Sequence, residues 1–365
     1  MSFLRVLLSS ARRSRRSPEL RSGQPTDDEL LLDAPDERIA PALVAAAQGA
    51  YAPAAALLAT TRERAEWEDR DRYTLRLAAF AHHRQDWLTD WLLAAPGDPD
   101  ALLVKAELEV RRALDSPSPA DRLRQAGPLI DAAAAGAPCD PVPWRIALDH
   151  ARGTRAAHDT FEALWEQAVR RSSHHYGCHV AALQYLAAQG STHRECFDFA
   201  EQAAEDALPG SLIQALPVRA AFALLAGAPA GDAGPGGSGP APATQLTARI
   251  DRAADLAIAL SAEYEAGDPW ASEVRNLLAY VLVSRERWAD ALEQFRLVGP
   301  YATSFPWAWP TPDTPAEDPL GRFLESRQAA RSRAGSAAAP EAGRTRPEGA
   351  RRWTPGRSRS DGHYA

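Results

Sequence analysis

Apolar residues recur at helical spacing along most of the chain, and the clearest case is the segment 274–300. Leu278 and Leu282 share one helical face in the first part of this segment. Ala291 and Phe295 follow in the A-x3-F spacing of a tetratricopeptide-like hairpin. The segment therefore predicts two helices folded back on each other. Because such a hairpin cannot bury its apolar face alone, we expect further hairpins stacked against it.

The same periodicity recurs through the rest of the chain, interrupted by proline, glycine and aspartate. Successive hairpins are expected at 73–95 and 100–135, with helical segments at 86–95 and 100–114. Further helices are expected at 140–151, 156–171, 174–189, 193–208, 211–226, 246–260 and 316–330. Thr192 and Glu195 form a capping box, which specifies the start of one of these helices. Pro217 is expected to kink its helix or to delay its start.

The patterns together predict an all-α fold. No run of alternating β-branched residues is bounded by turns, so no sheet is expected. We predict a tetratricopeptide-like, right-handed stack of antiparallel helical hairpins, an α-solenoid, with disordered termini. The expected parts are a basic flexible N-terminal arm at 1–35, a helical-repeat block at 36–226, a Gly/Pro linker at 227–243, C-terminal hairpins with a cap at 244–330, and a disordered basic tail at 331–365.

Charge is distributed unevenly along the chain. Residues 1–23 carry six arginines and Glu19, and residues 331–365 carry eight arginines and three acidic residues, so each end has a net charge of +5. Because the whole chain carries −7, the residues between the two ends carry −17. A negative body repels nucleic acid and anionic lipid, so these partners are disfavoured and a basic partner is favoured.

The cysteine count and the apolar segments bear on location. The chain has three cysteines, Cys139, Cys178 and Cys196. A small, odd number of cysteines does not indicate a disulfide framework and favours a reducing compartment. The N-terminus resembles a signal peptide only in outline, because Arg5 interrupts a short apolar run. Residues 39–61 lack formal charge, but their prolines, glycine and weakly apolar alanines argue against a membrane span. We expect a cytoplasmic protein without a membrane partner.

A pair of histidines is the sharpest candidate for chemistry. His175 and His179 have the i, i+4 spacing that can place two imidazoles on one metal ion. In a hairpin that turns near residue 190, Glu205 and Glu201 lie level with them, which would complete a His–His–Glu–Glu site. Both glutamates project away from the apolar stripe of their own helix. We therefore favour a solvated polar face, predict no cofactor, and keep a metal-dependent enzyme or metal sensor as an alternative.

Other motifs do not indicate catalysis. A G-x-G-x-x-G match at Gly234, Gly236 and Gly239 lies in the Gly/Pro linker, with no strand before it to form a dinucleotide site. The chain contains no H-E-x-x-H, P-loop, G-x-S-x-G or C-x-x-C motif. No catalytic residue is predicted.

The concave surface of the predicted stack is the better candidate for a binding site. The first helix of each hairpin lines the groove in a tetratricopeptide-like stack. In the last hairpin the groove-facing positions would be Glu273, Asn276, Tyr280 and Ser284. Asn276 could hold the backbone of an extended peptide, and the equivalent helix of the central hairpin would bring His175 and His179 near the same groove. A solvent-facing polar row is the competing interpretation.

Two segments also resemble a known family. Residues 174–223 and the upstream segment 91–106 are similar to the centre and the preceding hairpin of an uncharacterised bacterial domain-of-unknown-function family with a tetratricopeptide-like helical fold. Where that family tends to have Cys, Lys and Trp before a Gly-Ser-His turn, this chain has Leu-Ala-Ala-Gln at 186–189 and then Gly-Ser-Thr-His. The resemblance implies a fold and no activity, so it transfers no catalytic residue.

These observations predict a non-catalytic scaffold that binds a protein or peptide in its concave groove. The acidic body favours a basic partner. Besides the metal alternative, the arginine-rich ends leave open a regulator that contacts nucleic acid through them.

Overall fold

The computed structural model describes residues 25–226, 241–309 and 318–338, and these residues are mostly helical. The all-α class predicted from the periodicity is therefore confirmed. No helix in these three ranges is long and apolar enough to cross a membrane.

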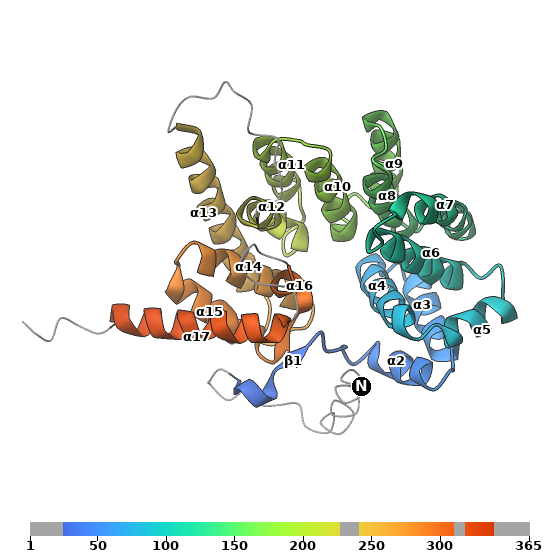
Figure 1. Ribbon diagram of the computed structural model, residues 1–365, viewed down its shortest axis with the longest axis horizontal. Coiled ribbons are helices and arrows are strands. Elements are labelled where there is room, and N and C mark those ends of the chain that lie inside the picture. Colours follow the sequence, from blue (N-terminus) through green and yellow to red (C-terminus); the bar gives the residue numbers. More distant parts are fainter. Residues whose placement is uncertain (1–24, 227–240, 310–317, 339–365) are drawn as a thin grey trace, which may run out of the picture.

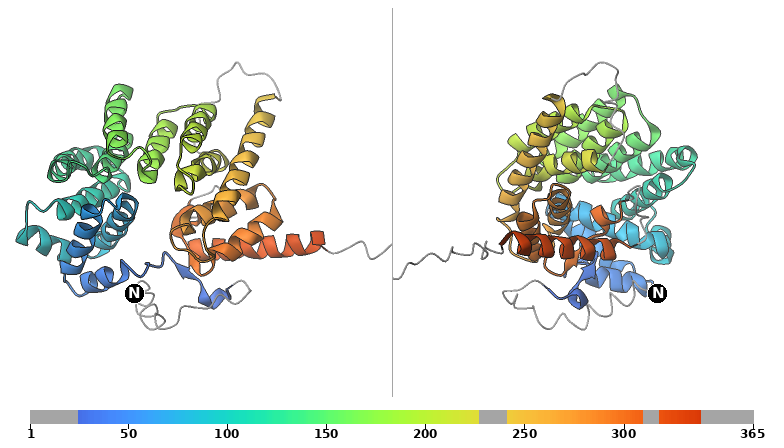
Figure 2. Two further views of the ribbon diagram at one scale, coloured as in Figure 1. Left: turned by 180° about the vertical axis from the view of Figure 1, so that it is seen from behind. Right: turned by 60° about the vertical axis from the view of Figure 1, so that its left-hand side comes forward.

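The helices follow one another around an arc that brings the last helices back towards the first (Figures 1 and 2). The first part of the arc contains α2 (Ala40–Ala47), α3 (Ala52–Glu63), α4 (Trp67–His83), α5 (Asp86–Ala94), α6 (Pro99–Leu114), α7 (Pro119–Gly136), α8 (Val142–Thr154) and α9 (His158–Arg171). The second part contains α10 (Tyr176–Ala188), α11 (His193–Glu205), η2 (Leu212–Ala215), α12 (Leu216–Leu225), α13 (Ala241–Ser261), α14 (Ser272–Ser284), α15 (Trp288–Val298), α16 (Ser304–Trp307) and α17 (Pro319–Ala338).

Local signals in the sequence set several helix ends, including the predicted capping box and the late start at Pro217. Thr192 and Glu195 form the expected capping box at the start of α11. Asp98 accepts two backbone N–H groups at the start of α6, where Pro99 occupies the first helical position. Pro217 lies at the start of α12, so that helix begins late, after η2. These ends follow from residues a few positions apart.

The predicted hairpin at 274–300 is present as α14 and α15. Leu278, Leu282, Ala291 and Phe295 are all fully buried, as the spacing indicated. Burying each large apolar side chain stabilises the fold by about 1.5–3 kcal/mol, so this seam is a main contributor to the C-terminal core.

The apolar core continues across the predicted linker. Phe222 on α12, Ile250 on α13 and Leu278 on α14 belong to one buried cluster. Helix α13 already begins at Ala241, inside the range expected to be linker, and residues 227–240 lie outside the described residues together with the G-x-G-x-x-G match. The chain on both sides of the linker therefore shares one hydrophobic core.

The N-terminal end of the described chain corrects two expectations. Residues 25–36, here called the strap, lie across the gap between the C-terminal helices and α2 (Figure 2). Within the strap, β1 (Leu31–Leu32) pairs in parallel with β2 (Tyr301–Ala302). The prediction of no sheet is wrong at this one small ladder, and the arm expected at 1–35 is ordered from residue 25. A two-residue strand is too short to show an alternating pattern.

Polar contacts hold the strap in place. The Asp33 carboxylate accepts hydrogen bonds from the backbone and the hydroxyl of Ser304. At the other end of the strap, the buried Arg327 of α17 donates to the Pro25 carbonyl at 3.1 Å and pairs with Asp27. The strap therefore joins the last helices of the arc to the first.

The C-terminal end also differs from the prediction. Helix α17 runs to Ala338, past the expected start of the tail at residue 331, and residues 339–365 lie outside the described residues. Trp307, expected to be partly exposed, is 1% exposed and packs against Phe295 and Phe323, whereas Trp309 is 41% exposed as expected. The aromatic segment before residue 310 is therefore part of the core.

Candidate functional site

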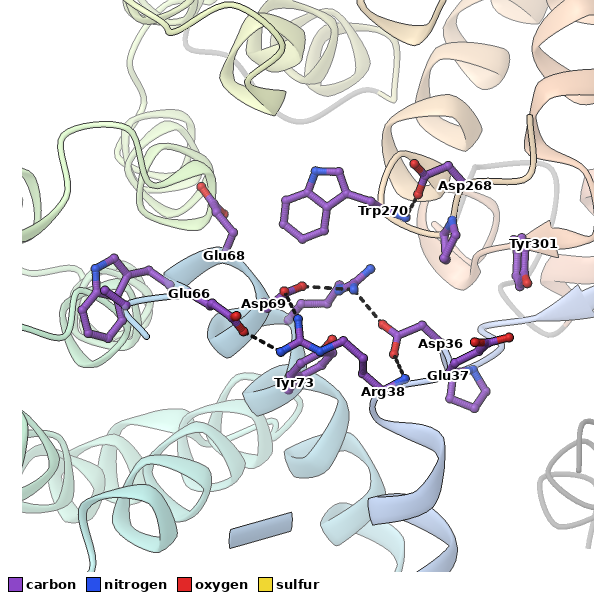
Figure 3. Close-up of a pocket in the computed structure, with 15 residues that line it drawn as sticks. Asp36, Glu37, Arg38, Glu66, Glu68, Asp69, Tyr73, Asp268, Trp270 and Tyr301 are labelled. Atoms are coloured by element: carbon purple, nitrogen blue, oxygen red, sulfur yellow. Dashed lines mark hydrogen bonds and ion pairs between the residues drawn. The ribbon is translucent and has the colours of Figure 1, made fainter. Parts of the chain in front are cut away.

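A pocket of about 730 Å³ lies where the two ends of the arc meet (Figure 3). One wall is the beginning of α4, the opposite wall is the loop before α14 together with β2, and the end of the strap lies between them. The lining includes six carboxylates and two guanidinium groups, from Asp36, Glu37, Glu66, Glu68, Asp69, Asp268, Arg38 and Arg72. It also includes the aromatic side chains of Trp67, Tyr73, Trp270 and Tyr301.

The position of the carboxylates follows from the start of α4. Glu66 precedes the helix, and Glu68 and Asp69 lie in its first turn. The N-terminal end of a helix carries a partial positive charge, which stabilises carboxylates placed there. The sequence therefore gathers negative charge at this helix end before any tertiary contact forms.

The two arginines of the pocket are each held by carboxylates and aromatic rings. Arg38 pairs with Glu66 and Asp69, and Arg72 pairs with Asp36 at 2.6 Å. The Arg72 guanidinium also lies 4.9 Å from the centre of the Trp270 ring, which belongs to the opposite wall. This cation–π contact connects the two walls of the pocket.

The other three carboxylates have no such partner. Glu37, Glu68 and Asp268 make no ion pair with any of the described residues, although Asp268 accepts the backbone N–H of Trp270 at 2.8 Å. The pocket therefore has an excess of negative charge that its own arginines do not neutralise.

Glu68 is the most enclosed of these unpaired carboxylates. One of its oxygens accepts the backbone N–H of Tyr176, at the start of α10, at 2.6 Å. Burial raises the pKa of Glu68, because removing water disfavours the charged form. In Figure 3 the Glu68 side chain extends towards the start of α10, and the Trp270 indole lies on the opposite wall of the pocket. A cation between them would offset the cost of that desolvation.

The loop that carries Trp270 is held in a defined shape. Gly267 has a φ of 73°, and its backbone N–H donates to the Leu297 carbonyl at 2.8 Å. A side chain at Gly299 would approach the Gly267 backbone to 3.1 Å, so the two glycines allow close packing here. With Asp268 capping the Trp270 amide, the indole is positioned before any ligand arrives.

Tyr73 supplies a second unpaired polar group. Its side chain lines the pocket and is fully buried, and its hydroxyl has no hydrogen-bond partner among the described residues. Its ring lies between the guanidinium groups of Arg38 and Arg72, at 5.5 and 5.4 Å. Burial raises the pKa of Tyr73, so the phenol stays protonated and remains a donor.

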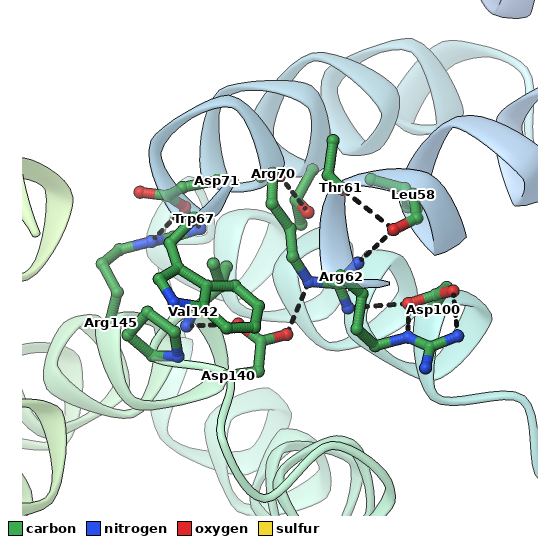
Figure 4. Close-up of polar contacts among 12 residues, drawn as sticks. Leu58, Thr61, Arg62, Trp67, Arg70, Asp71, Asp100, Asp140, Val142 and Arg145 are labelled. Carbon is green, nitrogen blue, oxygen red and sulfur yellow. Dashed lines mark hydrogen bonds and ion pairs between the residues drawn. The ribbon is translucent and has the colours of Figure 1, made fainter. Parts of the chain in front are cut away.

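Behind the pocket, α4 is anchored by a buried ionic network (Figure 4). Arg70 is 0% exposed, and its Nε and Nη2 donate to Asp140 at 2.6 Å and to Asp100 at 2.7 Å. Its Nη1 donates to the Leu58 carbonyl at 2.8 Å. Three donors thus tie α4 to α3, to α6 and to the segment that leads into α8.

A second buried arginine extends this network. Arg145 on α8 pairs with Asp71 on α4 at 2.7 Å, with Glu107 on α6 at 2.5 Å and with Asp149 at 3.2 Å. Gly177 on α10 passes so close to Asp71 that a side chain at this position would collide with the carboxylate. The face of α4 opposite the pocket is therefore closely packed as well as charge-paired.

The predicted histidine pair lies beside the pocket but does not line it. His175 is 0% exposed and caps α10: its Nδ1 accepts the Cys178 amide at 3.1 Å, and its Nε2 faces the Trp67 carbonyl at 3.3 Å. His179 is also buried, and its ring stacks edge-on against Trp165. The expected solvated polar face, and the expected groove contacts of both histidines, are therefore wrong.

The four-residue metal alternative is also not supported. Glu201 is held by Arg249 at 2.8 Å, and Glu205 is exposed on α11. No group of three or more His, Cys, Asp or Glu side chains that could hold a metal ion occurs in the described ranges. His175 and His179 have separate structural contacts, because one turns towards α4 and the other towards α9.

The four groove positions predicted on α14 do not form one open row. Glu273 and Ser284 are exposed, and Tyr280 is half-buried. Asn276 is 0% exposed: its amide donates to the Ser272 and Tyr301 carbonyls and accepts the Trp307 indole N–H at 2.8 Å. The expectation that Asn276 holds a peptide at the surface is therefore corrected, because its amide group is buried and hydrogen-bonded inside the core.

The pocket could not be predicted from the sequence because its two walls lie far apart in the chain. The run Glu-Trp-Glu-Asp-Arg-Asp-Arg-Tyr at 66–73 was an available signal, since it combines carboxylates and aromatic residues at a helix start. The opposite wall at 268–270 shows no comparable pattern. Only the closure of the arc brings Trp270 to Arg72.

Comparisons of the chain with protein-family models, with curated proteins and with solved structures found no match. The resemblance to a bacterial domain-of-unknown-function family with a tetratricopeptide-like fold therefore stays a prediction.

Proposed function

We propose that this protein is a non-catalytic, tetratricopeptide-like helical-repeat scaffold that binds a basic segment of a protein partner. The binding site is the pocket between the start of α4 and the loop before α14, in place of the row predicted along α14. The observation that carries the proposal is the surplus of carboxylates in this pocket, three of which have no ion pair among the described residues.

The lining of the pocket supports a cationic ligand. Carboxylates attract a cation over long range, and aromatic rings bind it at short range through their negative faces. The cavity of about 730 Å³ has room for more than one side chain of a partner. The body of the chain, with its charge of −17 between residues 24 and 330, would draw a basic segment towards this site.

A binding experiment tests the proposal. The full chain is titrated with a fluorescent peptide rich in arginine and lysine, with an acidic peptide of equal length as the reference. The double variant Glu37→Gln, Asp268→Asn removes two unpaired carboxylates, and the new asparagine can still accept the Trp270 N–H. We expect its affinity to fall about threefold to tenfold, and the loss to shrink as salt is added.

The matched control is Glu205→Gln, which removes one exposed carboxylate from α11, outside the pocket. Its affinity should stay close to that of the unchanged chain. Equal binding by the double variant and the unchanged chain would remove the pocket from the proposal, and failure of the basic peptide to bind at all would remove the proposed function.

A further inference from the structure

We propose that the group received by the pocket is an arginine side chain of the partner, whose guanidinium stacks on Trp270 and pairs with Glu68. The inference rests on the proposed function and names the side chain that the same site recognises. It is carried by two features: the Glu68 carboxylate, which has no ion pair among the described residues, and the partly covered Trp270 ring.

The pocket already binds guanidinium groups in this way. Arg72 combines a carboxylate pair with Asp36 and a ring contact with Trp270, and Arg38 combines carboxylate pairs with a position over Tyr73. A planar, weakly hydrated guanidinium can stack on a ring and hydrogen-bond a carboxylate in its own plane at the same time. An ammonium group is compact and strongly hydrated, and cannot make both contacts as well.

Glu68 and Trp270 offer the same combination without an occupant. Among the described residues the Glu68 carboxylate accepts one hydrogen bond, from the Tyr176 N–H to one of its oxygens, and the neighbouring His175 interacts with it electrostatically. The indole of Trp270 lines the pocket and is only half-buried, so Arg72 leaves part of the ring uncovered. Both side chains line the same pocket, from opposite walls.

The stability of the free protein gives an independent reason to regard Glu68 as a ligand-binding group. Desolvation raises the pKa of Glu68 and is a larger effect than that of the neighbouring His175, which lowers it, so glutamine would keep the contact with the Tyr176 N–H at a smaller desolvation cost. A residue that disfavours the free fold is typical of a functional site. A bound guanidinium would pair with the Glu68 carboxylate and so offset the cost of its burial.

Tyr73 lines the same wall of the pocket as Glu68. Its buried hydroxyl lacks a partner in the described part of the chain, and a buried polar group without one is unfavourable. Glu68 and Tyr73 belong to the same helix, so the rigid anchoring of α4 by Arg70 and Arg145 positions both.

The test compares two peptides of equal length and charge, one with arginine and one with lysine at the same positions, on the full chain. Free arginine amide is the third probe, because a guanidinium could also come from a small molecule. We expect the arginine peptide to bind at least about fivefold more tightly than the lysine peptide, and more tightly than the free amide.

Two variants test whether Glu68 and Trp270 cause the preference for arginine over lysine. Glu68→Gln and Trp270→Leu should each reduce the arginine-to-lysine ratio towards one, and Trp270→Phe should restore part of it by returning an aromatic ring. The controls are Glu205→Gln and Trp309→Leu, which change an exposed glutamate and an exposed tryptophan outside the pocket. Glu68→Gln should melt no lower than the unchanged chain, which separates lost binding from lost folding.

The outcomes distinguish the two proposals. Equal affinity for both peptides, with a loss of both in the Glu37→Gln, Asp268→Asn variant, would keep the proposed function and overturn the arginine preference. Tight binding of free arginine amide would replace the partner segment by a small guanidinium compound. If no basic probe binds, both proposals fail together.

Discussion

Two faces of α4 carry charged residues of the same kinds but use them differently. On the inner face, Arg70 and the neighbouring Asp71 are buried. Arg70 pairs with the carboxylates of Asp100 and Asp140, and the Asp71 carboxylate pairs with Arg145. On the outer face, Glu68 and Asp69 border a pocket in which half of the carboxylates have no arginine partner. These four residues are adjacent in the chain, so the difference comes entirely from what lies opposite each one.

The comparison separates charges that support the fold from charges available to a ligand. Buried ion pairs with several hydrogen bonds are costly to break from one side, because the remaining charge stays in a poorly solvated place. Unpaired carboxylates at a pocket contribute little to the fold and can disfavour it. Substitutions on the two faces should therefore change stability by different amounts and in opposite directions.

The largest effect is expected on the inner face. Arg70→Met leaves Asp140 buried without its arginine and weakens the contacts of Asp100, so the free energy of unfolding should fall by about 3–5 kcal/mol. Urea denaturation followed by circular dichroism measures the change. The control is Arg124→Met on α7, whose pair with Asp121 is about three-quarters exposed and should contribute almost nothing. Equal midpoints for both variants would contradict a structural role for the network.

The second effect concerns the support behind the far wall of the pocket. Asn276→Ala leaves the buried Trp307 N–H without its acceptor and the Tyr301 carbonyl without a donor, so stability should fall by about 1–3 kcal/mol. Thermal unfolding of this variant is compared with that of Ser284→Ala, an exposed position on the same helix. If both variants melt alike, Asn276 is not the internal support described here.

The third effect concerns the strap, which lies between the two walls. Asp33→Ala removes the acceptor for the backbone and hydroxyl of Ser304, and should cost about 1–2 kcal/mol. Amide hydrogen exchange should become faster at β1 and β2, while the amides of α4 stay protected. Asp28→Ala, at an exposed position of the strap, is the control. Unchanged exchange at β1 would show that the strap is held by other contacts.

The smallest effect is expected for Glu68→Gln, and its sign is opposite. Burial raises the pKa of Glu68 above the ordinary value of 4.5, so the folded state binds this proton more readily than the unfolded state. The penalty is present at neutral pH and disappears as pH falls through the raised pKa towards 4.5. The variant should therefore melt at or slightly above the unchanged chain at pH 7, with the difference lost on acidification. A variant that melts lower at pH 7 would place Glu68 with the structural charges.

The helices could be predicted from the sequence to a large extent, and the candidate site could not. The hairpin of α14 and α15 and the caps at Asp98 and Thr192 follow from residues within one or two turns of each other. The predicted site residues did not form the predicted sites. Asn276 and the two histidines have polar side chains, but all three are buried and make their contacts inside the protein. Periodicity indicates which apolar residues turn inward, but gives no sign of a buried polar residue whose partner is distant.

The sequence by itself determined that this chain is helical, where most helices begin and end, and which apolar stripes are buried. These properties depend on neighbouring residues and on a repeat of 3.6 positions per turn. Only the tertiary structure decided that Asp33 meets Ser304, 271 positions further along the chain, and that Trp270 covers Arg72. The physical reason is that pairing, desolvation and the formation of a pocket depend on the surfaces that face each other after the arc has closed.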